Sequence, residues 1–222
     1  MTRRVYDACA RAGRDPSTVA ILAATKYTDA PMMVHLAALG QRLFGENHVQ
    51  EARAKLEEIP GIVRQAIELH FIGHLQTNKA RVAAEVFDMV QSVDSVAVAM
   101  ALGRAAERAG RRLPVLLQVN VAGDLRKHGF STAALLAAAP ELLSIDGIEI
   151  QGLMTIGAIV PTPEESRPTF VALRNLRDQL AQSWPEGSMR HLSMGMSADF
   201  EVAIEEAATI IRVGTALVGH SH

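Results

Sequence analysis

Short apolar runs rich in valine, isoleucine and leucine alternate with longer, alanine-rich stretches along the chain. The short runs are typical of strands that are buried on both faces. Eight such runs predict strands at Val19–Lys26, Arg42–Asn47, Leu69–His74, Met89–Asp94, Val115–Val121, Glu149–Ile156, His191–Met196 and Ile210–Leu217.

The alanine-rich stretches between these runs predict helices, and Ser95 and Ser131 stand where helix caps are expected. One additional helix, Thr2–Ala12, precedes the first strand. The other predicted helices are Asp29–Leu39, Val49–Ile59, Gln76–Glu85, Ser95–Ala109, Ser131–Leu143, Glu164–Ser183 and Phe200–Ala208.

Eight strand–helix units predict a parallel sheet that closes into a (β/α)₈ TIM barrel. The length of 222 residues and the apolar share of 49% fit a single barrel domain over residues 1–222. An open, doubly wound sheet is the alternative. It is disfavoured because no strand is followed by the G-x-G-x-x-G turn of dinucleotide-binding sheets.

Net charge and cysteine content exclude some classes of protein. The net charge of −2 leaves no basic excess for binding nucleic acid, and Cys9 is the only cysteine, which excludes a disulfide framework. The charged start, Met1–Arg14, differs from a signal peptide, and no apolar stretch has the length of a membrane span. We therefore expect a soluble, cytoplasmic protein, and a compact barrel of this kind is expected to be a monomer.

Polar side chains gather where the predicted strands end, which in a TIM barrel is the end that carries the chemistry. Lys26 follows an almost wholly apolar strand, so its ammonium group is expected to be partly desolvated at the barrel mouth. Desolvation favours the neutral amine, which condenses with aldehydes. From position alone, a lysine that simply emerges into solvent is an equally good interpretation.

The last two strands carry groups suited to a phosphate. Gly214 and Thr215 lie on the eighth strand, and Ser197 follows the seventh. Loops after these strands often bind phosphate in TIM barrels. The alternative is that the glycines allow close packing and that Ser197 caps a helix.

Arg212 lies within an apolar strand and needs a partner there, either a carboxylate such as Glu46 or Asp94, or a ligand. The strand histidines His70, His74 and His191 match no zinc motif, so hydrogen bonding in the core or rim is expected and no metal site is predicted. Residues Pro161–Pro168 are the most loop-like stretch, and a lid over the mouth is one interpretation of them.

Motifs along almost the whole chain resemble those of the pyridoxal-phosphate homeostasis protein family. Seven segments carry the resemblance in the right order: Leu22–Lys26, Phe44–Glu51, His70–Lys79, Val115–Val121 with Lys127–Gly129, Gly152–Thr155, Leu192–Asp199 and Arg212–Thr215. Two positions depart from the usual pattern. Tyr27 stands where a small or polar residue is usual, and Lys127–Gly129 is a variant of the usual loop motif.

The resemblance implies that Lys26 carries pyridoxal 5′-phosphate (PLP) as a Schiff base. It implies that Ser197, Gly214 and Thr215 hold the phosphate and that Arg212 faces the pyridine nitrogen. Asn47 and Met196 would line the ring, while any role of Lys127 would be secondary. The implied fold is similar to the barrel domain of alanine racemase without its second domain.

Three functions remain open at this point. A PLP-binding homeostasis protein would hold the cofactor, and it would deliver it to PLP-dependent apo enzymes, without substantial amino-acid turnover. A low-activity amino-acid racemase would need a second base, and neither Tyr27, His74 nor His191 is a clear one. A third possibility is a metabolic enzyme that binds a sugar phosphate through Lys26. Arg212 favours the first, because a cation beside the pyridine nitrogen leaves it unprotonated and weakens the electron sink.

Overall fold

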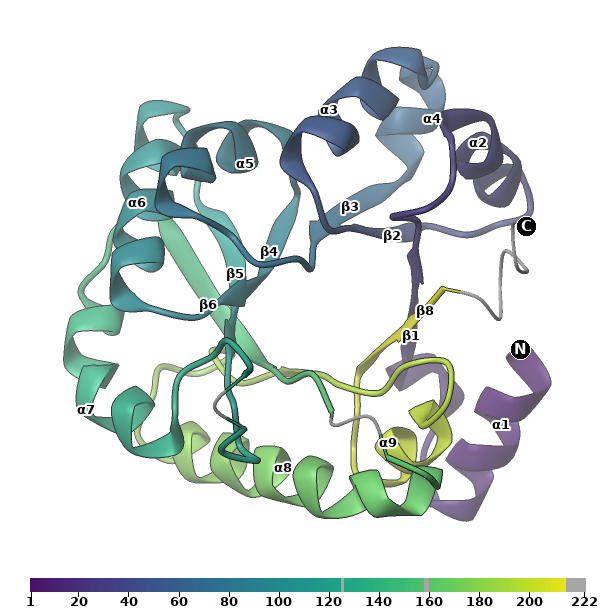
Figure 1. Cartoon of the computed structure of the whole chain (residues 1–222), viewed down its shortest axis with the longest axis vertical. Coiled ribbons are helices and arrows are strands. Elements are labelled where there is room, and N and C mark those ends of the chain that lie inside the picture. Colours follow the sequence, from purple (N-terminus) through teal and green to yellow (C-terminus); the bar gives the residue numbers. More distant parts are fainter. Residues whose placement is uncertain (125, 158–159, 215–222) are drawn as a thin grey trace.

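A closed barrel of eight parallel strands forms the centre of the molecule, with β1 paired to β8 (Figure 1). The computed structural model describes residues 1–124, 126–157 and 160–214. The strands are β1 (Ala20–Ala24), β2 (Leu43–Glu46), β3 (Glu68–Phe71), β4 (Met89–Val93), β5 (Leu113–Gln118), β6 (Ile148–Met154), β7 (His191–Ser193) and β8 (Ile210–Val213). The barrel predicted from the alternating pattern is thus confirmed.

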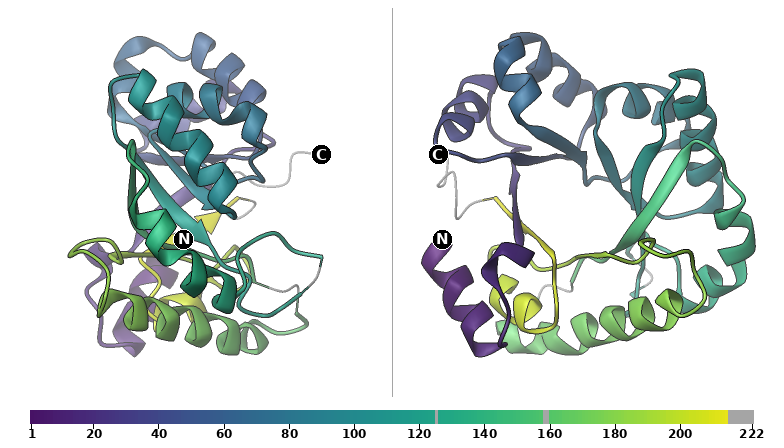
Figure 2. Two further views of the ribbon diagram at one scale, coloured as in Figure 1. Left: turned by 90° about the vertical axis from the view of Figure 1, so that its left-hand side faces the viewer. Right: turned by 180° about the vertical axis from the view of Figure 1, so that it is seen from behind.

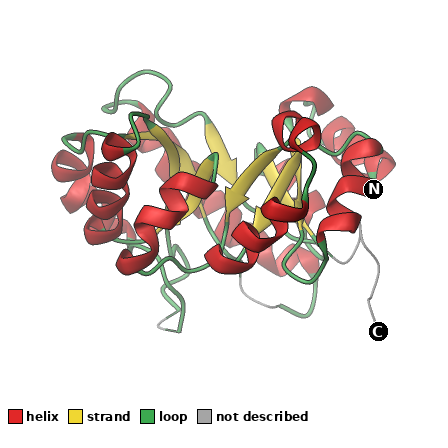
Figure 3. Cartoon of the chain, turned by 90° about the horizontal axis from the view of Figure 1, so that it is seen from above, coloured by secondary structure: helices red, strands yellow, loops and turns green. Residues whose placement is uncertain are grey.

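Helices surround the strands when the molecule is seen from the side and from above (Figures 2 and 3). They are α1 (Thr2–Arg11), α2 (Ala30–Ala38), α3 (Val49–Glu58), α4 (Gly61–Ala66), α5 (Ala80–Val86), α6 (Val96–Arg108), α7 (Thr132–Leu143), α8 (Arg167–Ala181) and α9 (Phe200–Glu205). Short 3₁₀ turns are η1 (Pro16–Thr18), η2 (Thr77–Lys79) and η3 (Pro163–Ser166). Among the described residues, no helix is long and apolar enough to cross a membrane.

The predicted helix starts at Ser95 and Ser131 are confirmed, because each side chain accepts a hydrogen bond from the backbone three residues later. Helix α4 was not predicted. It follows Pro60, has six residues and buries none of them, so it lacks the apolar stripe by which a helix is recognised in sequence.

The predicted additional helix α1 packs beside α9 (Figure 1). It thereby connects the segment before the first strand with the segment before the last strand. Arg4 bonds Glu201 at 2.9 Å and Arg11 bonds Glu205 at 2.7 Å. Arg14 donates to the carbonyl of Ile204 at 2.7 Å. These contacts fasten the segment before β1 to the segment before β8, where the barrel closes.

The core has two parts, as the alternation of side chains in the strands requires. A large apolar cluster fills the space between strands and helices. A smaller cluster fills the barrel interior with the side chains Leu22, Ile72, Met89, Leu116, Met154 and Ile210. Leu22 and Ile210 therefore identify the inward-facing positions of β1 and β8.

The N-terminal ends of the strands surround a cavity of about 550 Å³, whose lining includes His70 and His191. His191 is half-buried, and burial together with the positive charge of Arg190 lowers the pKa of its imidazole to about 4. The folded protein therefore keeps this side chain neutral in mildly acidic solution.

Acidification should destabilise the protein through His191. The unfolded imidazole gains its proton near the usual pKa of about 6.5, whereas the folded one remains neutral to a pH of about 4, so falling pH favours unfolding. We compare the fall in the free energy of unfolding between about pH 7 and about pH 5. This fall should be about 1–2 kcal/mol smaller in the His191→Gln variant than in the native chain. Urea titrations at both pH values measure this difference, and equal losses in the two proteins would contradict it.

Candidate functional site

Strands β1 and β8 lie side by side, so the groups that follow them meet at the C-terminal end of the barrel. Leu22 is the register partner of Arg212. Two residues further on, Gly214 lies against β1, since a Cβ atom placed on it would be 3.5 Å from the carbonyl oxygen of Ala24. Lys26 lies two residues after Ala24, the last residue of β1.

Lys26 occupies a turn, because β1 ends two residues earlier at Ala24. The turn is closed by the backbone N–H of Thr28, which donates to the carbonyl of Thr25 at 3.0 Å. Lys26 and Tyr27 are its central residues, and both are exposed, with the Lys26 Nζ 4.9 Å from the Tyr27 ring centroid. The Lys26 side chain is therefore exposed rather than partly desolvated, as had been expected.

An ion pair between the buried Glu46 and the partly buried Lys55 holds the start of this turn. Thr25 Oγ1 donates to Glu46 Oε1 at 2.6 Å, and Lys55 Nζ lies 2.8 Å from the same oxygen. Lys55 also donates to the carbonyl of Thr25 at 2.8 Å. Glu46 on β2 and Lys55 on α3 thus hold the residue that precedes Lys26. The sequence carried no signal for Lys55, which lies in a helix of mostly polar residues.

Arg212 is buried on β8, but its partners are neutral. One guanidinium nitrogen donates to Ser193 Oγ at 2.7 Å, and the other donates to the carbonyl of Thr155 at 2.7 Å. Of the two alternatives for Arg212, the carboxylate partner is wrong, since Glu46 pairs with Lys55 and Asp94 lies near His74. Burial lowers the pKa of Arg212 to about 10, and Asp199 opposes the shift, so the side chain stays charged at neutral pH.

Hydrogen bonds continue from Arg212 across the barrel interior. Ser193 Oγ donates to Gln91 Oε1 at 2.6 Å, and Gln91 Nε2 lies 2.7 Å from His70 Nδ1. The amide must donate here, so His70 Nδ1 accepts and the proton resides on Nε2. The core role expected of His70 is confirmed, and the Arg212 guanidinium is positioned by side chains from β4 and β7.

Asn47 follows β2 at the same end of the barrel and carries an orphaned polar atom. Its Oδ1 is buried and has no hydrogen-bond partner in the described part of the chain. A buried amide oxygen without a donor costs about 1–3 kcal/mol. A ligand that offers a donor at this point would remove that cost, so the site fits a polar group against Asn47.

The segment after β7 is organised by Asp199. Its buried carboxylate accepts hydrogen bonds from the backbone of Met196 at 2.7 Å and from Ser166 Oγ at 2.9 Å. Met196 and Ser197 are half-buried in the resulting loop, and Gly195 has a φ of 89° that favours glycine. Asp199 was missed as a positioning residue, because its contacts join two loops that are distant in sequence.

Three further expectations concern the loops. Thr215 lies outside the described residues. Residues Pro161–Pro168 contain η3 and the first residues of α8, so most of this stretch is helical rather than an open loop. Lys127 donates to the carbonyl of Gly157 at 2.8 Å and thereby joins the loop after β5 to the segment after β6.

Removing the amine of Lys55 should destabilise the fold strongly. Glu46 is buried, and its Oε2 already lacks a partner among the described residues, so Lys55→Met leaves an uncompensated buried carboxylate. We expect a loss of about 3–5 kcal/mol in the free energy of unfolding, measured by urea titration. Adding Glu46→Gln to this variant should restore part of the loss, and a double variant less stable than Lys55→Met would contradict the charge argument.

Comparisons with known proteins agree with these motifs. Residues 4–222 match the family model described as alanine racemase, N-terminal domain. The pyridoxal phosphate homeostasis protein of Aquifex aeolicus (strain VF5) is 38% identical over 97% of this chain and 93% of its own length. That of Vibrio cholerae serotype O1 is 37% identical over 99% of this chain and 92% of its own.

Solved structures give the same result. PipY of Synechococcus elongatus PCC7942, solved with PLP bound, is 39% identical, with a TM-score of 0.83 over 98% of this chain and 99% of its own. Alanine racemase of Clostridium difficile 630 is 12% identical, with a TM-score of 0.71 over 99% of this chain and 56% of its own, and therefore shows a shared barrel fold alone. The chain belongs to the pyridoxal phosphate homeostasis protein family, whose barrel is that of the alanine racemase N-terminal domain.

Proposed function

We propose that this protein binds PLP at the C-terminal end of its barrel and serves PLP homeostasis in the cell, with Lys26 as the attachment point. The observation that carries the proposal is the PLP-bound structure of PipY, which shares 39% identity over 98% of this chain. The orphaned Oδ1 of Asn47 supports it independently, since it leaves an unmet acceptor at the same end of the barrel.

Lys26 is suited to attachment because its side chain is exposed and its backbone is fixed. The amine is open to an incoming aldehyde, while Glu46 and Lys55 hold the preceding residue, Thr25, through buried and partly buried hydrogen bonds. The Lys26 nitrogen would bond to the aldehyde carbon, and the aldehyde oxygen would leave as water. A fixed turn holds the backbone of Lys26 just after the C-terminal end of β1 and leaves its amine exposed.

The remaining roles follow the family motifs residue by residue. Ser197, Gly214 and Thr215 would hold the phosphate, and Asn47 and Met196 would line the ring. Gly214 leaves the space a side chain would fill beside Ala24, which lets the backbone of β8 approach a ligand. We infer that all these groups belong to one domain over residues 1–222, acting as a monomer.

Arg212 favours holding the cofactor over turnover. When bound, PLP draws electrons from attached groups into its ring, most strongly with the pyridine nitrogen protonated. Arg212 is a donor that keeps its positive charge at neutral pH, and Ser193 and Thr155 fix its direction. A fixed cation facing that nitrogen disfavours its protonation. We therefore propose a carrier that supplies PLP-dependent apo enzymes rather than an amino-acid racemase.

Lys26→Ala should abolish covalent PLP attachment. The purified native chain, incubated with PLP and reduced with borohydride, should gain one cofactor on the peptide that contains Lys26 by mass spectrometry. Lys79→Ala removes another lysine from the C-terminal side of β3 and should leave the labelling unchanged. Equal labelling of the Lys26→Ala chain would refute the attachment point, and α-proton exchange of alanine above background by the loaded native chain would refute the carrier role.

Ser193→Ala should weaken the support of Arg212. It removes the hydroxyl that accepts from the guanidinium at 2.7 Å, a hydrogen bond to a charged group worth about 1.5–3 kcal/mol. Ser92→Ala is the matched control, because Ser92 is also buried but its Oγ has no partner in the described part of the chain. Urea titration should show a larger loss for Ser193→Ala than for Ser92→Ala, and the reverse order would contradict the assigned network.

A further inference from the structure

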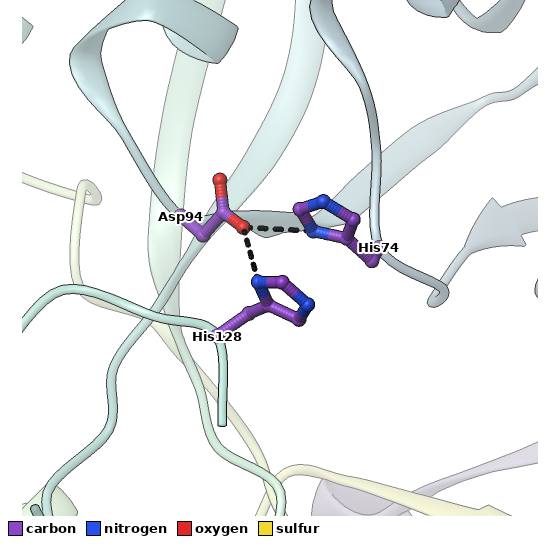
Figure 4. Close-up of side chains that lie close together, drawn as sticks. All are labelled: His74, Asp94 and His128. Atoms are coloured by element: carbon purple, nitrogen blue, oxygen red, sulfur yellow. Dashed lines mark hydrogen bonds and ion pairs between the residues drawn. The ribbon is translucent and has the colours of Figure 1, made fainter. Parts of the chain in front are cut away.

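Three side chains with metal-binding atoms meet at the C-terminal ends of the neighbouring strands β3, β4 and β5 (Figure 4). His74 follows β3, Asp94 follows β4 directly, and His128 lies in the connection between β5 and α7. One ligand atom from each lies within 4.8 Å of the others. None of these residues is among those assigned to PLP above.

The two imidazoles approach the same carboxylate oxygen. His74 Nδ1 lies 3.0 Å from Asp94 Oδ2, and His128 Nδ1 lies 3.9 Å from that oxygen. The rings are stacked, with centroids 3.6 Å apart and planes inclined by 12°. Nitrogen and oxygen ligands about 2.1 Å from one metal ion lie roughly 3.0–3.5 Å from each other. The two Nδ1–Oδ2 separations lie close to this range, and the stacked rings must turn before both imidazoles can bind one ion.

The cluster is partly buried and its scaffold is ordered. The Asp94 side chain is 9% exposed, whereas those of His74 and His128 are 44% and 59% exposed. The backbone of His128 is held by Gln118, whose amide donates to its carbonyl at 3.0 Å. The exposed imidazoles leave an open side through which an ion could reach the carboxylate, with room for water ligands.

The charges favour a cation. Among the residues that the structure describes, Asp94 has ion-pair contacts with His74 and His128, and no lysine or arginine pairs with it. Neutral imidazoles can move their protons from Nδ1 to Nε2, and the Nε2 atoms point away from Asp94 in Figure 4. Both Nδ1 atoms then offer a lone pair on the side of the carboxylate, and the stacked rings must tilt toward each other to share one ion.

We propose that His74, Asp94 and His128 bind one divalent transition-metal ion of the zinc class. Two imidazoles and one carboxylate suit Zn²⁺, Co²⁺ and Ni²⁺, whereas Mg²⁺ and Ca²⁺ prefer oxygen ligands throughout. The three ligands come from separate loops, which explains why no zinc motif is visible in the sequence. The site goes beyond the proposed function and does not require PLP to be bound.

Titration of the full, untagged chain with Co²⁺ in the absence of PLP tests the proposal. The native chain should bind one ion with a visible ligand-field spectrum, and Zn²⁺ should displace it. Asp94→Asn and His128→Gln should each weaken binding by about tenfold or more. His128 is exposed, so His128→Gln keeps the test valid even if Asp94→Asn disturbs folding.

Two control variants separate this site from other histidines. His35→Ala changes an exposed histidine on α2, and His220→Ser with His222→Ser changes those near the C-terminus. Both should bind Co²⁺ like the native chain. The proposal is overturned if the native chain shows no ligand-field spectrum, or if binding survives His128→Gln and is lost with the terminal histidines. Neither outcome affects PLP labelling of Lys26, so the two proposals fail separately.

Discussion

The lateral pairing of β1 with β8 is the constraint on which the candidate site depends. It closes the barrel and places the first and last strands in register, with Leu22 opposite Arg212. Residues at opposite ends of the sequence therefore share one rim, and Gly214 lies against Ala24, two residues before Lys26. The ion pairs between α1 and α9 reinforce this closure from outside, which links an apparently peripheral helix to the geometry of the site.

The barrel interior combines an apolar layer with polar groups whose burial is unfavourable unless they are hydrogen-bonded. Leu22, Met154 and Ile210 fill part of it, yet Arg212 lies buried beside them. A buried guanidinium is tolerated only with good partners, and here Ser193 and the carbonyl of Thr155 provide them. Neutral partners leave the positive charge of Arg212 uncancelled, so it remains available to a ligand. A carboxylate partner, one of the two alternatives that the sequence left open, would have neutralised it.

The sequence predicted the fold better than the surroundings of the site. All eight strands were recognisable, most of them from their apolar residues, whereas α4 buries none of its residues and left no pattern. The rim position of Lys26 followed from strand order, but its exposure depends on where β1 ends and the turn begins. Other contacts of the site join separate elements, and the periodicity within one element carries no information about them. They are the hydrogen bonds of Arg212, the Lys55–Glu46 ion pair and the hydrogen bond between Asp199 and Ser166.

Polar groups divide around the rim by strand. The groups proposed for PLP follow β1, β2, β7 and β8, whereas the imidazole–carboxylate cluster follows β3, β4 and β5. The two regions meet inside the barrel, where Gln91 on β4 accepts from Ser193 and thereby supports Arg212 on β8. Gln91 lies on β4, three residues before Asp94, so the strand that supports Arg212 also leads to the imidazole–carboxylate cluster. The hydrogen bonds between Gln91 and Ser193 and between Ser193 and Arg212 therefore connect the strand that leads to Asp94 with the strand that leads to Gly214.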